Sequence, residues 1–163
     1  MKRSFGLLSL LLALVVTVQS TQAADVGDQA PEIKAQSWLN SDGVSIAKNS
    51  NKIVVVEFWA TWCGPCRQSI PHLVAMNQKY KNKGVVIAGL TQEGAGAVKG
   101  FAAKMGMDYP VGMGSAASNA YGVEGIPVAF VVAPGGKIVW TGHPMDGLDK
   151  AIEAALKATP PKI

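Results

Sequence analysis

An apolar run that leads directly into two closely spaced cysteines is the feature that most limits the fold of this chain. Residues 53–59 place β-branched side chains next to one another, which predicts a strand buried on both faces of a sheet. Cys63 and Cys66 follow, and apolar residues at near-helical spacing then extend from 68 to 80. The order of strand, cysteine pair and helix predicts the start of a βαβ unit, with both sulfurs at the junction.

A helix that begins near Gly64 would give the two sulfurs different tasks. Cys63 would cap its N-terminus, where unpaired N–H groups and the macrodipole favour the reactive thiolate. Cys66 lies close enough along the chain to attack a mixed disulfide formed at Cys63. Pro65 suits the first turn of a helix, and Gly64 lets a partner chain approach the sulfur. We therefore predict a catalytic, redox-active disulfide in which Cys63 is the nucleophile and Cys66 is the resolving thiol.

Two other uses of the cysteine pair stay open at this point. A structural disulfide that closes so short a loop would constrain the unfolded chain little. A zinc site needs four ligands, and the chain offers only His72 and His143 as further nitrogen ligands. We predict neither a metal site nor a cofactor.

The first residues have the pattern of an export signal. Lys2 and Arg3 precede an apolar run at residues 7–18, and small and polar residues follow it. We predict a cleaved signal peptide at residues 1–24 and one domain at 25–163, located in the periplasm or otherwise exported. An uncleaved anchor is the alternative, although the run is shorter than the roughly 20 residues that span a bilayer.

The charge balance argues against a nucleic-acid-binding protein. The chain has 15 Lys and Arg against 11 Asp and Glu, and the signal segment holds two of the basic residues, which leaves 13 against 11. A nearly neutral domain lacks the clustered basic surface that nucleic acid requires. Exported domains commonly carry stabilising disulfides, but this chain has two cysteines and both lie in one pair. That usage favours a redox pair over a structural link.

The remaining sequence alternates between strand and helix patterns. Residues 26–51 contain short strand-like segments and an Asp42-Gly43 turn signal, and we predict a β-hairpin extension there. A turn signal at 134–136 joins two further strands. The predicted strands are 84–90, 128–133 and 137–141, and the predicted helices are 98–105, 116–121 and 147–158.

These residues resemble a known family. The run from Val56 to Cys66, and Gly125-Ile126-Pro127 before a strand, resemble the thioredoxin fold. The segment 26–31 resembles the TlpA/ResA-type exported thiol-disulfide oxidoreductases of that superfamily. The resemblance implies an α/β thioredoxin fold in which helices flank a central mixed β-sheet and an N-terminal β-hairpin is added.

The resemblance also implies roles for single residues. Pro127 matches a cis-proline that packs beside the cysteines and leaves the backbone of Ile126 free to pair with an extended substrate. Trp62 matches an aromatic residue of the docking surface, to which Gly64 and Pro65 also belong. Glu57 matches a buried acid that serves proton transfer for Cys66, and burial would raise its pKa. Exposure of Glu57 at the end of the strand is the alternative.

The function that the resemblance implies is an exported thiol-disulfide oxidoreductase. The direction in which it transfers electrons is a separate question. The Gly-Pro dipeptide and the Ile before the cis-proline resemble reducing thioredoxins, so we predict a protein-disulfide reductase. Expected partners are disulfide-containing exported proteins with haem-binding or copper-site cysteines, and a membrane-embedded thiol reductase as electron donor. We expect a monomer that binds no nucleic acid.

Two alternative functions are a thiol peroxidase and a copper metallochaperone. Peroxiredoxins have the pattern Pro-x-x-x-Thr-x-x-Cys, but Val56 and Ala60 stand at its Pro and Thr positions here. A copper carrier would use both thiolates for a soft metal, but no Met or His cluster accompanies the pair. The oxidoreductase therefore remains the leading interpretation.

Overall fold

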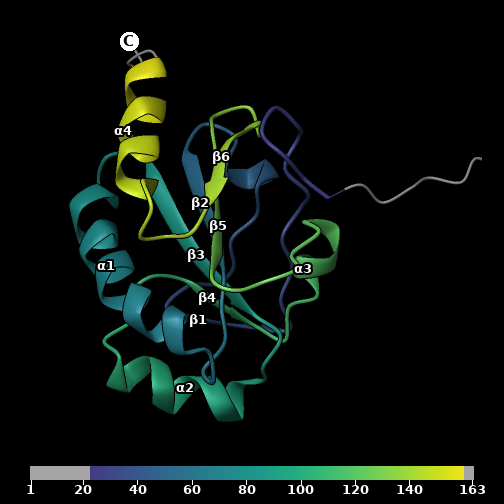
Figure 1. Ribbon diagram of the computed structural model, residues 1–163, viewed down its shortest axis with the longest axis vertical. Helices are drawn as coiled ribbons and strands as arrows, with labels where there is room; N and C mark the ends of the chain where they lie inside the picture. The colour runs from purple at the N-terminus through teal and green to yellow at the C-terminus, as the bar shows by residue number, and fades with distance from the viewer. Residues whose placement is uncertain (1–22, 160–163) are drawn as a thin grey trace, which may run out of the picture.

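One six-stranded mixed sheet forms the centre of the protein (Figure 1). The computed structural model describes residues 23–159. In the order β1-β4-β3-β2-β5-β6, β3 runs parallel to both β2 and β4, and the other pairs are antiparallel. The strands are β1 (Ser37–Leu39), β2 (Ile53–Phe58), β3 (Val85–Thr91), β4 (Val111–Met113), β5 (Val128–Val132) and β6 (Ile138–Gly142).

Helices cover both faces of this sheet. On one face, side chains of α1, α2 and α4 pack into the larger core, whereas α3 and the N-terminal segment close the smaller core on the other face. None of the helices in the described region is both long and apolar enough to span a membrane. The helices are α1 (Gly64–Tyr80), α2 (Ala95–Lys104), α3 (Ala117–Ala120) and α4 (Leu148–Ala158), with a 3-10 turn η1 at Ala47–Asn49.

The run that dominates the sequence is the central strand, as predicted. Every residue of β2 is buried, because β3 and β5 pair with its two edges and helices or loops cover both faces. Val55 joins the core beneath α1, and Val54 and Val56 join the opposite core. Burial of a Val side chain contributes roughly 1.5–3 kcal/mol, so this strand anchors both layers. The mixed sheet with helices on both faces, which the thioredoxin fold implies, and the helix start near Gly64 are confirmed.

The predicted N-terminal β-hairpin is wrong. Residues 37–39 do form a strand, but it pairs with β4 on the far side of the sheet instead of with residues 44–46. The Glu32 carboxylate accepts the N–H groups of Ile46 (2.8 Å) and Ala47 (3.2 Å), so these groups are unavailable to a strand partner. Val44 and Ile46 are buried in the smaller core, and the chain continues into the 3-10 turn η1.

Candidate active site

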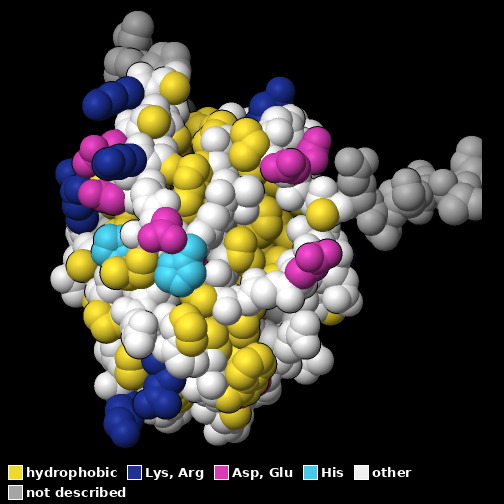
Figure 2. Space-filling model, in the orientation of Figure 1, with side chains coloured by type: hydrophobic (Ala, Val, Ile, Leu, Met, Phe, Trp, Pro, Cys, Tyr) yellow, Lys and Arg dark blue, Asp and Glu magenta, His cyan; other side chains and the backbone are white. Residues whose placement is uncertain are grey.

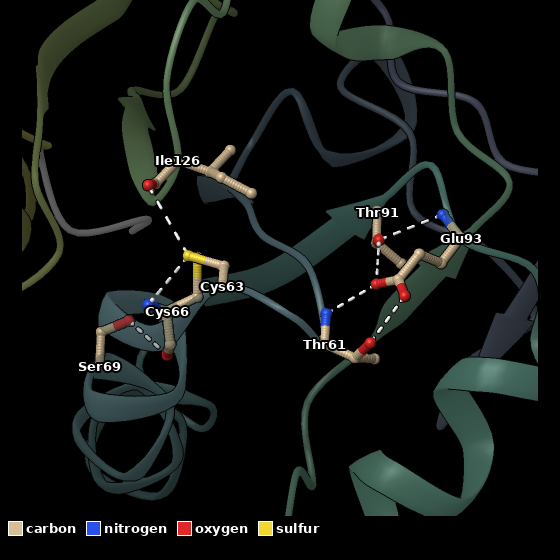
Figure 3. Close-up of a disulfide and its surroundings, with 7 residues drawn as sticks. All are labelled: Thr61, Cys63, Cys66, Ser69, Thr91, Glu93 and Ile126. Atoms are coloured by element: carbon tan, nitrogen blue, oxygen red, sulfur yellow. Dashed lines mark hydrogen bonds between the residues drawn. A yellow bond between two sulfur atoms is a disulfide. The ribbon is translucent and has the colours of Figure 1, made fainter.

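The two cysteines form a disulfide at the point where β2 gives way to α1 (Figure 3). Cys63 is the N-cap of α1, and its sulfur accepts the N–H of Cys66 at 3.2 Å. That hydrogen bond and the helix N-terminus would stabilise a thiolate at Cys63. Cys66 has no exposed surface, whereas Cys63 keeps 5%. An incoming thiol therefore reaches the pair from the side of Cys63.

The segment of Ile126 and Pro127 brings a backbone carbonyl close to the Cys63 sulfur. The Ile126–Pro127 peptide bond is cis, and Pro127 is buried. The carbonyl oxygen of Ile126 lies 3.7 Å from the Cys63 sulfur, and Figure 3 shows it directed at the disulfide. A disulfide sulfur carries no hydrogen, so this contact becomes a hydrogen bond when Cys63 is a thiol. The structure thus brings Ile126 and Pro127 to the pair, and their part in substrate pairing stays a prediction.

A cleft of about 380 Å³ lies next to the cysteine pair, and Trp62 and Ile126 are among the residues that line it. Trp62 is 73% exposed, and Gly64 and Pro65 lie at the surface next to it. Figure 2 shows hydrophobic side chains in the middle of one face, with most Lys and Arg side chains towards its margins. An exposed aromatic side chain beside an accessible sulfur suits the docking of an extended chain, and docking by these three residues remains a prediction.

The loop before the cysteines is held by an acid that sequence reasoning missed. The Glu93 carboxylate accepts the backbone N–H of Thr61 (2.6 Å) and its hydroxyl (2.7 Å), and Glu93 N–H donates to Thr91 (3.2 Å) (Figure 3). Hydrogen bonds to a charged acceptor are among the stronger ones in proteins. Glu93 therefore fixes the loop that presents Trp62. Glu93 follows β3 and Thr61 follows β2, so a role for Glu93 at this loop can be recognised only when the pairing of β2 with β3 is known.

Glu57 is fully buried in β2, so the alternative of a solvent-exposed strand end is wrong. It has no exposed surface, and burial raises its pKa from 4.5 to about 8. On the neighbouring strands it faces the small residues Gly89 and Ala129. Side chains alternate along a strand, which puts Glu57 on the face of Val55 and Trp59. An acid with this pKa suits proton exchange near neutral pH, and that role stays a prediction.

In the part of the chain that the structure describes, no three His, Cys, Asp or Glu side chains gather closely enough to hold an ion. The chemistry at hand is that of the two sulfurs and the buried acid. The predicted signal peptide at residues 1–24 falls almost wholly outside the described residues and stays a prediction.

Known proteins share both this sequence and this architecture. Residues 26–141 match the model of the AhpC/TSA family. The thiol-disulfide oxidoreductase ResA of Bacillus thuringiensis is 32% identical over 117 residues, which are 70% of this chain and 67% of ResA. The chain belongs to the AhpC/TSA family, among its ResA-type thiol-disulfide oxidoreductases.

Further matches support this assignment over most of the chain. The ResA of Bacillus subtilis is 28% identical over 141 residues, which are 82% of this chain and 78% of that protein. A thiol:disulfide interchange protein of the DsbE type from Chlorobium tepidum is 30% identical, with a TM-score of 0.72 over 82% of this chain and 99% of that one. This ResA-type oxidoreductase is therefore an enzyme of thiol-disulfide exchange, and it carries a Cys63–Cys66 disulfide. That these two cysteines are the reacting pair stays a prediction.

Proposed function

We propose that this ResA-type oxidoreductase is exported and reduces disulfides in partner proteins. The observation that carries the proposal is a disulfide at the N-terminus of α1 that is open only on the side of Cys63, next to the backbone of Ile126 and the exposed Trp62. Such a site accepts an extended protein segment and has one sulfur ready to attack. The Gly64-Pro65 pair between the cysteines supports the reducing direction, because it resembles reducing thioredoxins.

The proposed reaction has two exchange steps. The Cys63 thiolate attacks one sulfur of a substrate disulfide, a mixed disulfide forms, and the other substrate sulfur leaves and takes up a proton. The Cys66 thiolate then attacks the Cys63 sulfur, so the Cys63–Cys66 bond closes and the second substrate thiol is released. Two electrons pass from the dithiol to the substrate. A separate reductase must return two electrons and two protons to the enzyme before the next cycle.

The proposed partners follow from this cycle. Substrates are exported proteins whose cysteines must be reduced before they receive haem or copper, as in cytochrome c maturation or copper-site assembly. The electron donor is a membrane-embedded thiol reductase, because an exported enzyme has no access to cytoplasmic donors. Only Cys63 of the pair has exposed surface, which supports an exchange in which the substrate and the reductase each react with this sulfur in turn.

Trapping the mixed disulfide tests this proposal. The variant Cys66→Ser keeps the nucleophile but cannot complete the second step, so its partners should accumulate on Cys63 when the full chain is expressed in its native host. The matched control is Cys63→Ser, which keeps Cys66 buried and should trap nothing. Partners with haem-attachment or copper-site cysteines support the proposal. An unreactive Cys63 and no trapped partner would contradict it.

The other two candidate functions predict different results with the same protein. A peroxidase needs the Thr hydroxyl of its motif, and Ala60 supplies none at that position. A copper carrier would retain Cu(I) tightly and would lack disulfide reductase activity. Slow peroxide turnover together with rapid reduction of insulin disulfides is the result expected of the oxidoreductase.

A further inference from the structure

Four buried polar atoms that lack a hydrogen-bond partner belong to three side chains that meet around Gly89 on β3. Within residues 23–159 they are both carboxyl oxygens of Glu57, Nε1 of Trp59 and the hydroxyl of Tyr109. These side chains are at most 2% exposed. Buried polar groups in folded proteins almost always have a partner, so a group of exceptions in one place requires an explanation.

A glycine allows the three side chains to converge. Gly89 lies opposite Glu57 in the parallel register of β2 and β3. A Cβ atom on Gly89 would lie 3.1 Å from Nε1 of Trp59, 3.1 Å from Cε2 of Tyr109 and 3.2 Å from Oε2 of Glu57. All three therefore border the same small volume, and a larger residue at position 89 would push into it.

The segment that carries Tyr109 is held firmly against the sheet. The N–H of Gly89 donates to the carbonyl of Pro110 at 3.0 Å. The side-chain amide of Asn40 donates to the carbonyls of Met107 (2.8 Å) and Tyr109 (3.1 Å). The backbone that carries Tyr109 is thus held by the Asn40 side chain on one side and by Gly89 of β3 on the other, independently of any bond that the hydroxyl makes.

The chemistry of the group fits one state of Glu57 better than the other. An ionised carboxylate only accepts hydrogen bonds, and the indole N–H and the phenol O–H are both donors. Hydrogen bonds to the charged form stabilise that form. The strands β3 and β5 on either side of β2 carry no ionisable side chain. Glu57 is the only buried Asp, Glu, Lys, Arg or His among the described residues, so the charged side chains of α1, α2 and α4, which pack on the same face, and of Asp108 beside Tyr109 all keep contact with solvent.

We infer that Tyr109 is a positioning residue for the exchange reaction, because its hydroxyl and the Trp59 indole N–H form a two-donor site that holds the Glu57 carboxylate while it is ionised. The donors reach the carboxylate after a small rotation of the carboxyl group or through one water molecule. This inference rests on the proposed exchange function and on the predicted role of Glu57 as the base for Cys66.

In the proposed step, one proton moves from the Cys66 thiol to Glu57. The Glu57 carboxylate takes the proton of the Cys66 thiol and becomes a neutral carboxylic acid. The Cys66 thiolate attacks the Cys63 sulfur, and the electron pair of the broken mixed disulfide leaves on the substrate sulfur. Glu57 afterwards releases its proton to water, and the two donors receive the carboxylate again. Without the Tyr109 hydroxyl, fewer molecules would hold Glu57 in the ionised state that the step requires.

The variant Tyr109→Phe tests the inference, because it removes one hydroxyl and keeps the ring. The readout is the carboxyl 13C resonance of Glu57, assigned with Glu57→Gln and titrated in the oxidised protein, where no thiol titrates. Loss of the donor should raise the pKa of Glu57 by about one unit, and should slow release of substrate from a Cys63 mixed disulfide by about tenfold at pH 7. The indole N–H resonance of Trp59 in the unchanged protein should follow the same titration.

Tyr121→Phe is the matched control. Tyr121 is also a buried tyrosine, but its hydroxyl donates to the carbonyl of Pro31 on the other side of the sheet. An unchanged Glu57 titration in Tyr109→Phe, an equal shift in Tyr121→Phe, or a Trp59 resonance that ignores the titration would overturn the inference. If Glu57→Gln releases substrate with the same pH dependence as the unchanged protein, the base role of Glu57 fails and the inference fails with it. If only the Tyr109→Phe shift is missing, the proposed function stands.

Discussion

Replacing Glu57 by Gln should stabilise the oxidised protein at neutral pH. Burial raises the pKa of Glu57 from 4.5 to about 8. Between these two values the folded protein holds a proton that the unfolded chain has released, so the free energy of unfolding falls by roughly 1.4 kcal/mol for each pH unit. At pH 7 the accumulated loss is about 3 kcal/mol. Gln has the same shape and no proton to release, so Glu57→Gln should recover about this amount.

Denaturant unfolding of the oxidised protein at several pH values measures the effect. The stability gap between Glu57→Gln and the unchanged protein should be small near pH 4.5 and should widen steadily up to about pH 8, where it levels off. The control is Glu124→Gln, which removes an exposed carboxylate that lines the cleft next to the cysteine pair. It should change stability by less than about 0.5 kcal/mol. A gap that is absent at pH 7, or that does not vary with pH, would refute the reasoning.

Two further variants test the N-terminal segment and the predicted docking surface. Burial tends to raise the pKa of Glu32, but hydrogen bonds from Ile46, Ala47, Ile33 and Ser45 outweigh it and lower that pKa. Glu32→Ala should therefore reduce the unfolding free energy by about 1–2 kcal/mol at pH 7, with the difference fading as acid protonates the folded-state carboxylate. Trp62→Ala should leave thermal stability nearly unchanged because the ring is 73% exposed, yet should lower kcat/KM for a protein disulfide about tenfold. An equal loss with a small disulfide reagent would argue against a docking role for Trp62.

The sequence predicted those parts of the fold whose signal is local. The β-branched run of β2, the cysteine pair and the amphipathic pattern of α4 each have a period or spacing that a short window reveals. The strand β4 escaped prediction because Val111–Met113 is short and contains glycine. It is a strand because β3 on one side and β1 on the other supply its hydrogen bonds.

The parts of the site that escaped prediction depend on contacts between distant residues. Glu93 lies 32 positions from Thr61, and only the pairing of β2 with β3 brings its carboxylate to that loop. Tyr109 and Glu57 border the same small volume because Gly89 has no side chain to fill it, which a single sequence does not indicate. The predicted hairpin failed for the same reason, since a side chain, Glu32, took the backbone donors that a second strand would have used.

The reduction potential of the Cys63–Cys66 couple tests the central claim most directly. Equilibration of the full chain with glutathione mixtures of known composition, followed by quantification of the dithiol and disulfide forms, gives this value. A reductase should have a potential near that of thioredoxin, about −270 mV. A value above roughly −150 mV, towards the strong oxidant DsbA at about −120 mV, would contradict the account.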